Sequence, residues 1–132
     1  MLLRTTSGPI TPSEWLYREL LCGIPGIGVM NEIPSTSRLS WFVFIIRLQP
    51  DINRDRLIAH LEKSRIPSRA YFTPIHLQPF YRERFGFREG DFPVTERVAA
   101  STLALPFHGN LSNGDMEHVA ESLRSAIIQA AA

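Results

Sequence analysis

The residues from Arg69 to Arg84, RAYFTPIHLQPFYRER, form the part of the sequence richest in side chains that recognise ligands. These sixteen residues include four aromatic rings, three arginines and one histidine. An arginine guanidinium binds phosphate through two hydrogen bonds, and rigid rings stack on sugars or bases. Such a loop suits an anionic ligand that contains rings. The composition also fits a second interpretation, in which the rings fill a core and Arg82, Glu83 and Arg84 form a solvated helix face.

Few other residues could take part in covalent or metal chemistry. Lys63 is the single lysine among 14 basic residues, so a Schiff base within this chain could form only there. The single cysteine, Cys22, lies in an apolar stretch, which predicts a small core residue. No two histidines have the spacing of a helical ligand pair, and no serine has the flanking glycines of a nucleophile elbow. We therefore predict neither a metal site nor a catalytic residue. The four histidines are His60, His76, His108 and His118.

The composition limits the classes of partner. The 132 residues carry 14 Lys and Arg against 13 Asp and Glu, a formal net charge of +1. Nucleic-acid binding usually shows as a basic excess on one face, which this balance does not support. No apolar run approaches the roughly 20 residues that cross a bilayer, and the first residues are too quickly polar for a secretory signal. We expect a cytoplasmic protein with neither membrane nor nucleic acid as a partner.

The clearest strand is predicted at residues 41–48, WFVFIIRL. The run shows no alternation of apolar and polar residues before Arg47, which is typical of a strand covered on both faces. Residues 23–28 contain three glycines and resemble a phosphate loop. They follow a helix and include Pro25, where backbone donors would be needed, so we predict an irregular linker there.

Hydrophobic spacing and capping residues predict five helices, at 11–22, 53–65, 79–85, 93–101 and 112–129. Short extended segments are expected at 66–72 and 103–106. In the last helix, one core face is predicted from Met116, Val119, Leu123 and Ile127. The fold class is α/β (α+β): a small two-layer sandwich whose short mixed sheet is covered by helices. Residues 1–10 are expected to be a flexible tail, and residues 11–132 a single small domain.

Several blocks of the sequence, in order, resemble the DegT/DnrJ/StrS-type sugar aminotransferases. The densest are IPSRAYFTPIH at 66–76 and QPFYRERFG at 78–86. Around them the same order is kept by WLYREL at 15–20, SWFVF at 40–44, RDRL at 54–57, PVTE at 93–96, LALP at 103–106 and LS at 111–112. Each block is short, but their order and distances over residues 12–128 are similar to the family's carboxy-terminal part.

The resemblance implies the carboxy-terminal small domain of a fold-type I aminotransferase that aminates a keto-sugar on a nucleotide diphosphate. The family holds pyridoxal phosphate through a lysine of its large domain. Lys63 does not match that lysine, so we expect no cofactor in this chain and no activity of the chain alone. Arg65 stands where the family commonly has glycine, so we expect the helix end there to be remodelled.

By the same resemblance, His76, Tyr71 and Arg69 would bind substrate and form the wall on the substrate side of the active site. The alternative for His76 is a hydrogen bond that braces the loop. The expected partners are the large domain or a full-length homologue, a nucleotide sugar of polysaccharide or antibiotic biosynthesis, and a second copy through self-association. The alternative function is a stand-alone binding or regulatory module, or an inert remnant of the domain.

Overall fold

A computed structural model of the chain describes residues 12–29 and 42–130. Its helices are α1 (Pro12–Leu21), α2 (Arg54–Lys63), the 3-10 helix η1 (Ile75–Leu77), α3 (Pro79–Phe85), α4 (Pro93–Ser101) and α5 (Asn113–Ala130). Its strands are β1 (Ile27–Val29), β2 (Phe44–Leu48), β3 (Arg69–Ala70) and β4 (Thr102–Leu105). The predicted α/β class and the predicted helices are confirmed. The expected tail at 1–10 and the start of the expected strand at 41 lie outside the described residues.

The four strands form one sheet in the order β1-β2-β4-β3. Every neighbouring pair in it is antiparallel, so the prediction of a mixed sheet is wrong. The physical reason is the position of β4. The unit β2-α2-β3 does leave β2 and β3 parallel, but β4 arrives later in the chain, lies between them and pairs with each in the opposite direction.

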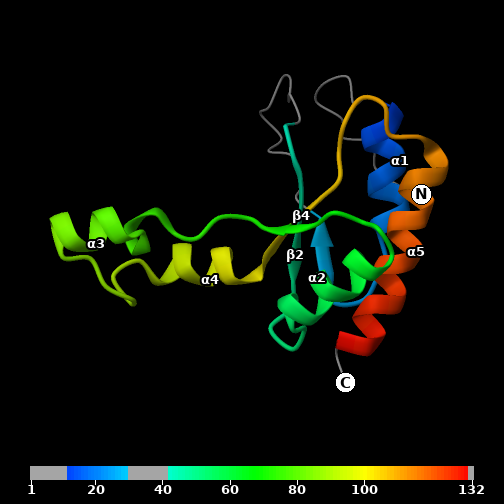
Figure 1. Ribbon diagram of the computed structural model, residues 1–132. Coiled ribbons are helices and arrows are strands. Elements are labelled where there is room, and N and C mark those ends of the chain that lie inside the picture. The colour runs from blue at the N-terminus through cyan, green and yellow to red at the C-terminus, as the bar shows by residue number, and fades with distance from the viewer. Residues whose placement is uncertain (1–11, 30–41, 131–132) are drawn as a thin grey trace, which may run out of the picture.

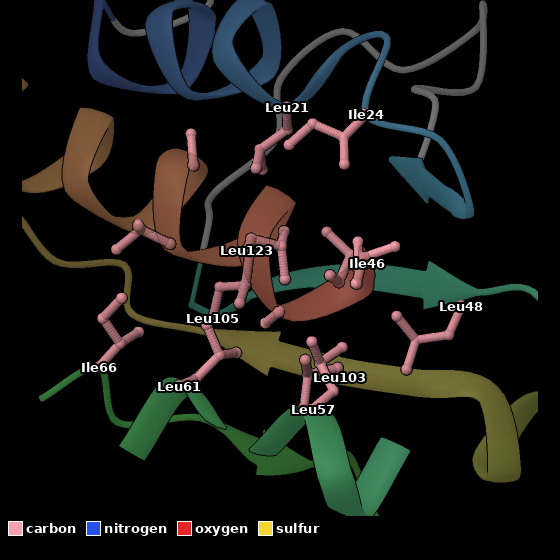
Figure 2. Packing of buried hydrophobic residues seen from close by; sticks show 14 of the residues in the cluster. Leu21, Ile24, Ile46, Leu48, Leu57, Leu61, Ile66, Leu103, Leu105 and Leu123 are labelled. Atoms are coloured by element: carbon pink, nitrogen blue, oxygen red, sulfur yellow. The ribbon is translucent and has the colours of Figure 1, made fainter. Parts of the chain in front are cut away.

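The core lies between one face of this sheet and the helices α1, α2 and α5 (Figures 1 and 2). Alternation along β2 turns Phe44, Ile46 and Leu48 towards the helices. On the other face of the sheet, Ile45 is only partly buried and Arg47 is exposed. The prediction that this strand is covered on both faces is therefore wrong for the described residues. The predicted face of α5 is confirmed, since Met116, Val119, Leu123 and Ile127 are all buried.

The caps of the helices follow the chemistry of their sequences. Asn53 caps α2, and its side-chain oxygen accepts a hydrogen bond from the backbone N–H of Arg56 at 3.0 Å. Ser112 exchanges hydrogen bonds with Asp115 at the start of α5. The prediction of an irregular linker at 23–28 is wrong for its last residues, which belong to β1 and pair with β2. A strand of three residues is too short to show a periodic pattern.

Residues 72–101, named the arm below, leave this body and carry η1, α3 and α4 (Figure 1). None of the residues of the arm belongs to the hydrophobic core. No helix in the described part of the chain is long and apolar enough to cross a membrane.

The end of α2 has a left-handed turn at Arg65, whose φ is 61°. The N–H of Arg65 donates to the carbonyl of Glu62, and that of Ile66 donates to the carbonyl of Leu61. These two bonds, with Ile66 and Leu61 both buried, make a Schellman motif, in which glycine usually occupies the left-handed position. The expected remodelling does not occur: the backbone keeps the glycine-type conformation and arginine adopts it.

Replacing Arg65 with glycine is expected to stabilise the fold by about 0.5–1 kcal/mol. A left-handed conformation costs an L-residue about 1–2 kcal/mol, and the greater freedom of glycine in the unfolded chain offsets part of that gain. Chemical denaturation followed by circular dichroism measures the change in the free energy of unfolding. As the matched control, Lys63→Gly places glycine inside the same helix and should destabilise by about 1 kcal/mol. A loss of stability in Arg65→Gly would contradict the assignment of strain to this residue.

Candidate functional site

The arm exposes most of the large apolar side chains that the described residues leave uncovered. Neither α3 nor α4 contains a buried residue. Eight of the eleven exposed large apolar side chains in the described part of the chain lie on the arm. They are Phe72, Ile75, Phe80, Tyr81, Phe85, Phe92, Val94 and Val98. The interpretation in which the rings of the 69–84 segment fill a core is therefore wrong, while the exposed face of Arg82, Glu83 and Arg84 is confirmed.

One carboxylate joins three segments of the arm. Oε1 of Glu96, on α4, lies 2.9 Å from Nε2 of His76 on η1. The same carboxylate accepts hydrogen bonds from the backbone N–H groups of Gly90, at 3.0 Å, and Phe92, at 3.3 Å. We call these four residues the Glu96 cluster. Because α3 and the turn that follows it lie between His76 and Gly90 in the sequence, the cluster closes this part of the arm into one unit.

Aromatic rings enclose the imidazole of His76, which is only 7% exposed. The ring of Phe92 lies 4.8 Å from it, centroid to centroid, and the ring of Phe87 lies 6.3 Å away. Phe85 packs in turn against Phe87 at 5.9 Å. The two contacts of His76 are edge-on, a geometry that aromatic pairs prefer. His76 is thus held by both a carboxylate and aromatic rings, as the bracing alternative requires.

The hydrogen bonds to Glu96 also change its titration. The backbone N–H of Gly90 is the largest cause, followed by the His76 side chain, and together they hold the pKa of the Glu96 carboxyl below its ordinary value of 4.5. Donors that bind the charged form favour it over the neutral acid. Glu96 is therefore ionised at neutral pH, and its contacts are those of a structural carboxylate.

The other two predicted site residues lie at the root of the arm. Arg69 is on β3, paired with Ala104, and its side chain is exposed. Tyr71 is half-buried, and its ring packs on that of Phe72 at 4.3 Å between centroids. Within the described chain, no hydrogen bond or ring contact joins His76 to either residue. The structure thus places Arg69 and Tyr71 close together in the chain and holds His76 separately, inside the Glu96 cluster.

A pocket of about 330 Å³ lies where the arm meets the body. Its lining includes Arg54 from α2, Phe72 and Pro74 from the start of the arm, and Glu96 and Ala99 from α4. We call it the elbow pocket.

Reasoning from the sequence did not assign a role to Arg54 or to Glu96. Both stand in the short blocks RDRL and PVTE that carry the family resemblance, which was the available signal. Two other expectations concern reactive groups. Cys22 is exposed, so the prediction of a core cysteine is wrong: it follows the last turn of α1, just beyond the buried face. Among the described residues, no group of three or more His, Cys, Asp or Glu side chains could hold a metal ion.

Comparison with known proteins decides the family of this arrangement. Residues 13–124 match the sequence profile of the DegT/DnrJ/EryC1/StrS aminotransferase family. The chain belongs to this family. Its curated relatives include the erythromycin biosynthesis sensory transduction protein EryC1 of Saccharopolyspora erythraea, 33% identical over 83% of this chain and 29% of its own length. Another is dTDP-4-amino-4,6-dideoxy-D-glucose transaminase of Escherichia coli, 35% identical over 74% of this chain and 27% of its own length.

Solved aminotransferase structures share the fold. The aminotransferase TlmJ from Streptoalloteichus hindustanus superposes with a TM-score of 0.75 and 27% identity, over 88% of this chain and 30% of its own. A sugar aminotransferase from Streptococcus pneumoniae, at 21% identity, has a TM-score of 0.76 and shows the same fold. The chain therefore spans about 30% of the length of the family members that it matches.

Acid is expected to loosen the arm before the sheet. Because the pKa of Glu96 is lowered in the folded state, its stabilisation is complete well above pH 4.5 and is lost as pH falls below that value. Amide hydrogen exchange, corrected for the intrinsic rate, should show Gly90 and Phe92 losing protection relative to Ile46 of β2. Glu96→Gln should remove this pH dependence and lower the protection at neutral pH. The neighbouring Glu89→Gln should keep the wild-type profile, and a Glu96→Gln variant with that profile would contradict the assignment.

Proposed function

We propose that this chain is the carboxy-terminal small domain of a pyridoxal-phosphate-dependent sugar aminotransferase, where it forms the wall on the substrate side of the active site. The observation that carries this proposal is the extent of the family match. It covers residues 13–124 of this chain, yet the chain spans only 27–30% of the length of the curated relatives. The remaining part of such an enzyme would hold the cofactor and the catalytic lysine.

The residues around Lys63 do not fit the cofactor, which supports this division. Lys63 is exposed near the end of α2, beside a surface hollow of about 270 Å³. No carboxylate is among the described residues that line this hollow, although the pyridine nitrogen of the cofactor needs an acidic partner. An exposed amine without such a partner gives no anchored site for a Schiff base, so we derive no chemical step through the cofactor in this chain.

The uncovered surfaces support a role inside a larger enzyme. The arm carries eight exposed apolar side chains, and the second face of the sheet leaves Ile45 only partly buried. Large apolar side chains gathered in the open on one segment usually mark an interface. We propose that the rest of the enzyme, or a full-length homologue, covers it. The alternative is that a second copy of this chain covers the same surface. A measurement of the molecular mass of the isolated chain in solution distinguishes the two, because only self-association gives a dimer.

Within the wall, we propose different roles for the three predicted residues. Arg69 is exposed, and its guanidinium would bind the diphosphate of a nucleotide sugar through two hydrogen bonds. The ring of Tyr71 would pack beside the ligand. His76 would act through the loop, because its Nε2 is already engaged by Glu96. Which sugar is aminated would depend on the other domain.

A chimera tests the proposal. Residues 12–130 would replace the matching part of a family member of known activity, and the product would be assayed with that enzyme's own nucleotide sugar. We expect cofactor-dependent transamination, and no lysine-dependent absorbance when the isolated chain is mixed with pyridoxal phosphate. A folded chimera without activity, or a stoichiometric absorbance of the isolated chain that Lys63→Ala abolishes, would overturn the proposal.

In that chimera, Arg69→Ala is expected to raise the KM for the nucleotide sugar about 10- to 100-fold, with kcat little changed. Loss of a charge-assisted contact to phosphate costs about 1.5–3 kcal/mol, and a contact made equally in the ground and transition states appears in KM. Steady-state kinetics provides the measurement. Arg56→Ala removes an exposed arginine of α2 and should leave both constants unchanged. Equal effects of the two substitutions would remove the case for Arg69.

A further inference from the structure

Arg54 occupies a position that its own helix disfavours. It is the first residue of α2, directly after the cap Asn53. The amino-terminal end of a helix carries partial positive charge, so a cation there gains nothing from the local structure. When a residue is unfavourable for the helix in which it lies, a contact with another part of the fold usually offsets the cost.

For Arg54, this contact is with the carboxy-terminal end of α4. Nη1 of Arg54 donates hydrogen bonds to the carbonyl oxygens of Ala99 and, at 3.2 Å, of Thr102. Ala99 lies in the last turn of α4, and Thr102 follows that helix as the first residue of β4. The last carbonyls of a helix lack partners within it and carry partial negative charge. Because α4 has no basic residue in its own last turn, cations reach its end from other elements: Arg54 of α2 binds its carbonyls, and Nε of Arg47 on β2 donates to Oγ of Ser101 at 3.4 Å.

Both ends of the arm meet at this contact. Oγ1 of Thr102 donates to the carbonyl of Tyr71 at 3.2 Å, which joins the end of the arm to its beginning. The next residue, Phe72, turns the chain with a φ of 59°, in the left-handed region. Bulky residues rarely adopt this conformation unless the surroundings impose it. The segments that enter and leave the arm are thus joined by a hydrogen bond between Thr102 and Tyr71, and Arg54 links them to the body through Thr102.

We propose that Arg54 is a positioning residue that fixes the direction of the arm relative to the sheet. Through that direction it sets the place of Tyr71 and of the Glu96 cluster beside the substrate, a consequence that rests on the function proposed above. The elbow pocket, lined by Arg54, Phe72 and Glu96, is the space that this contact keeps open between arm and body. Without the guanidinium of Arg54, the carbonyls at the end of α4 would lose their donor, and the arm would adopt a range of directions.

A distance measurement on the isolated chain tests the first part of the proposal. Spin labels at Arg88→Cys on the arm and Glu121→Cys on α5, both exposed positions, would be introduced in a Cys22→Ser background. Pulsed electron paramagnetic resonance should give one narrow distance distribution, which Arg54→Met broadens at least twofold. Arg56→Met is the matched control and should leave it narrow. Arg54→Lys, which keeps the charge and one set of donors, should restore most of the narrow distribution.

If Arg54→Met does not fold, Arg54→Gln, which removes the charge, replaces it and is compared with wild type by hydrogen exchange over residues 72–98. Faster exchange there, with the sheet unchanged, supports the proposal. A distribution in Arg54→Met identical to wild type, or exchange in Arg54→Gln identical to wild type, overturns it.

The chimera tests the second part. Arg54→Met should raise the KM for the nucleotide sugar about tenfold with kcat changed less than twofold, and Arg54→Lys should recover most of the loss. A broadened distance distribution with unchanged KM overturns the link to the substrate wall but leaves the function proposed above intact. A chimera that is inactive with wild-type Arg54 overturns that function, while the distance measurement still tests the contact itself.

Discussion

The carboxylate of Glu96 holds together three segments of an arm that has no hydrophobic core of its own, and the geometry of the candidate site depends on this arrangement. His76, Gly90 and Phe92 reach it from η1, from the turn after α3 and from the start of α4. Hydrogen bonds to a charged acceptor are stronger than those between neutral groups, which suits a segment that buries little apolar surface. The rings around His76 add local packing to this polar cluster.

The body and the arm are stabilised by different physics. In the body, the core residues of α1, α2 and α5 pack against one face of the sheet, and burial of apolar area supplies the driving force (Figure 2). In the arm, polar contacts fix the backbone while the large apolar side chains remain exposed. This division matches a chain that belongs to an aminotransferase family and spans under a third of the length of its relatives. The exposed side chains are those that a larger assembly would cover.

Local signals in the sequence predicted the local structure well. The spacing of Met116, Val119, Leu123 and Ile127 gave the buried face of α5, and Asn53 gave the cap of α2, because both effects act within a few residues. Longer-range features were not accessible in this way. Insertion of β4 between β2 and β3 depends on pairing across the whole chain, so the sheet was expected to be mixed. The sequence of β2 is apolar up to Arg47, although on the second face of the strand Ile45 is only partly buried and Arg47 is exposed.

The candidate site shows the same limit. The sequence marked His76, Tyr71 and Arg69 by their types, but Glu96 contacts His76 from 20 residues away and Arg54 contacts Thr102 from 48 residues away. Arg65 was expected to alter the end of α2. Instead, the two hydrogen bonds accepted by Leu61 and Glu62 preserve the Schellman turn, and Arg65 adopts the left-handed conformation that the turn requires. In each case tertiary contacts decide what a single residue does.

The strand order has a consequence for how this domain can vary. Ala70 of β3 pairs directly with Leu103 of β4, so residues 71–102 form an excursion between two partners in the same ladder. In topological terms the arm is a very long hairpin loop. Closing a longer or shorter loop changes the free energy only with the logarithm of its length. Insertions and deletions can therefore accumulate in it while the register of the sheet stays fixed, so the arm can change in length without any change in the body.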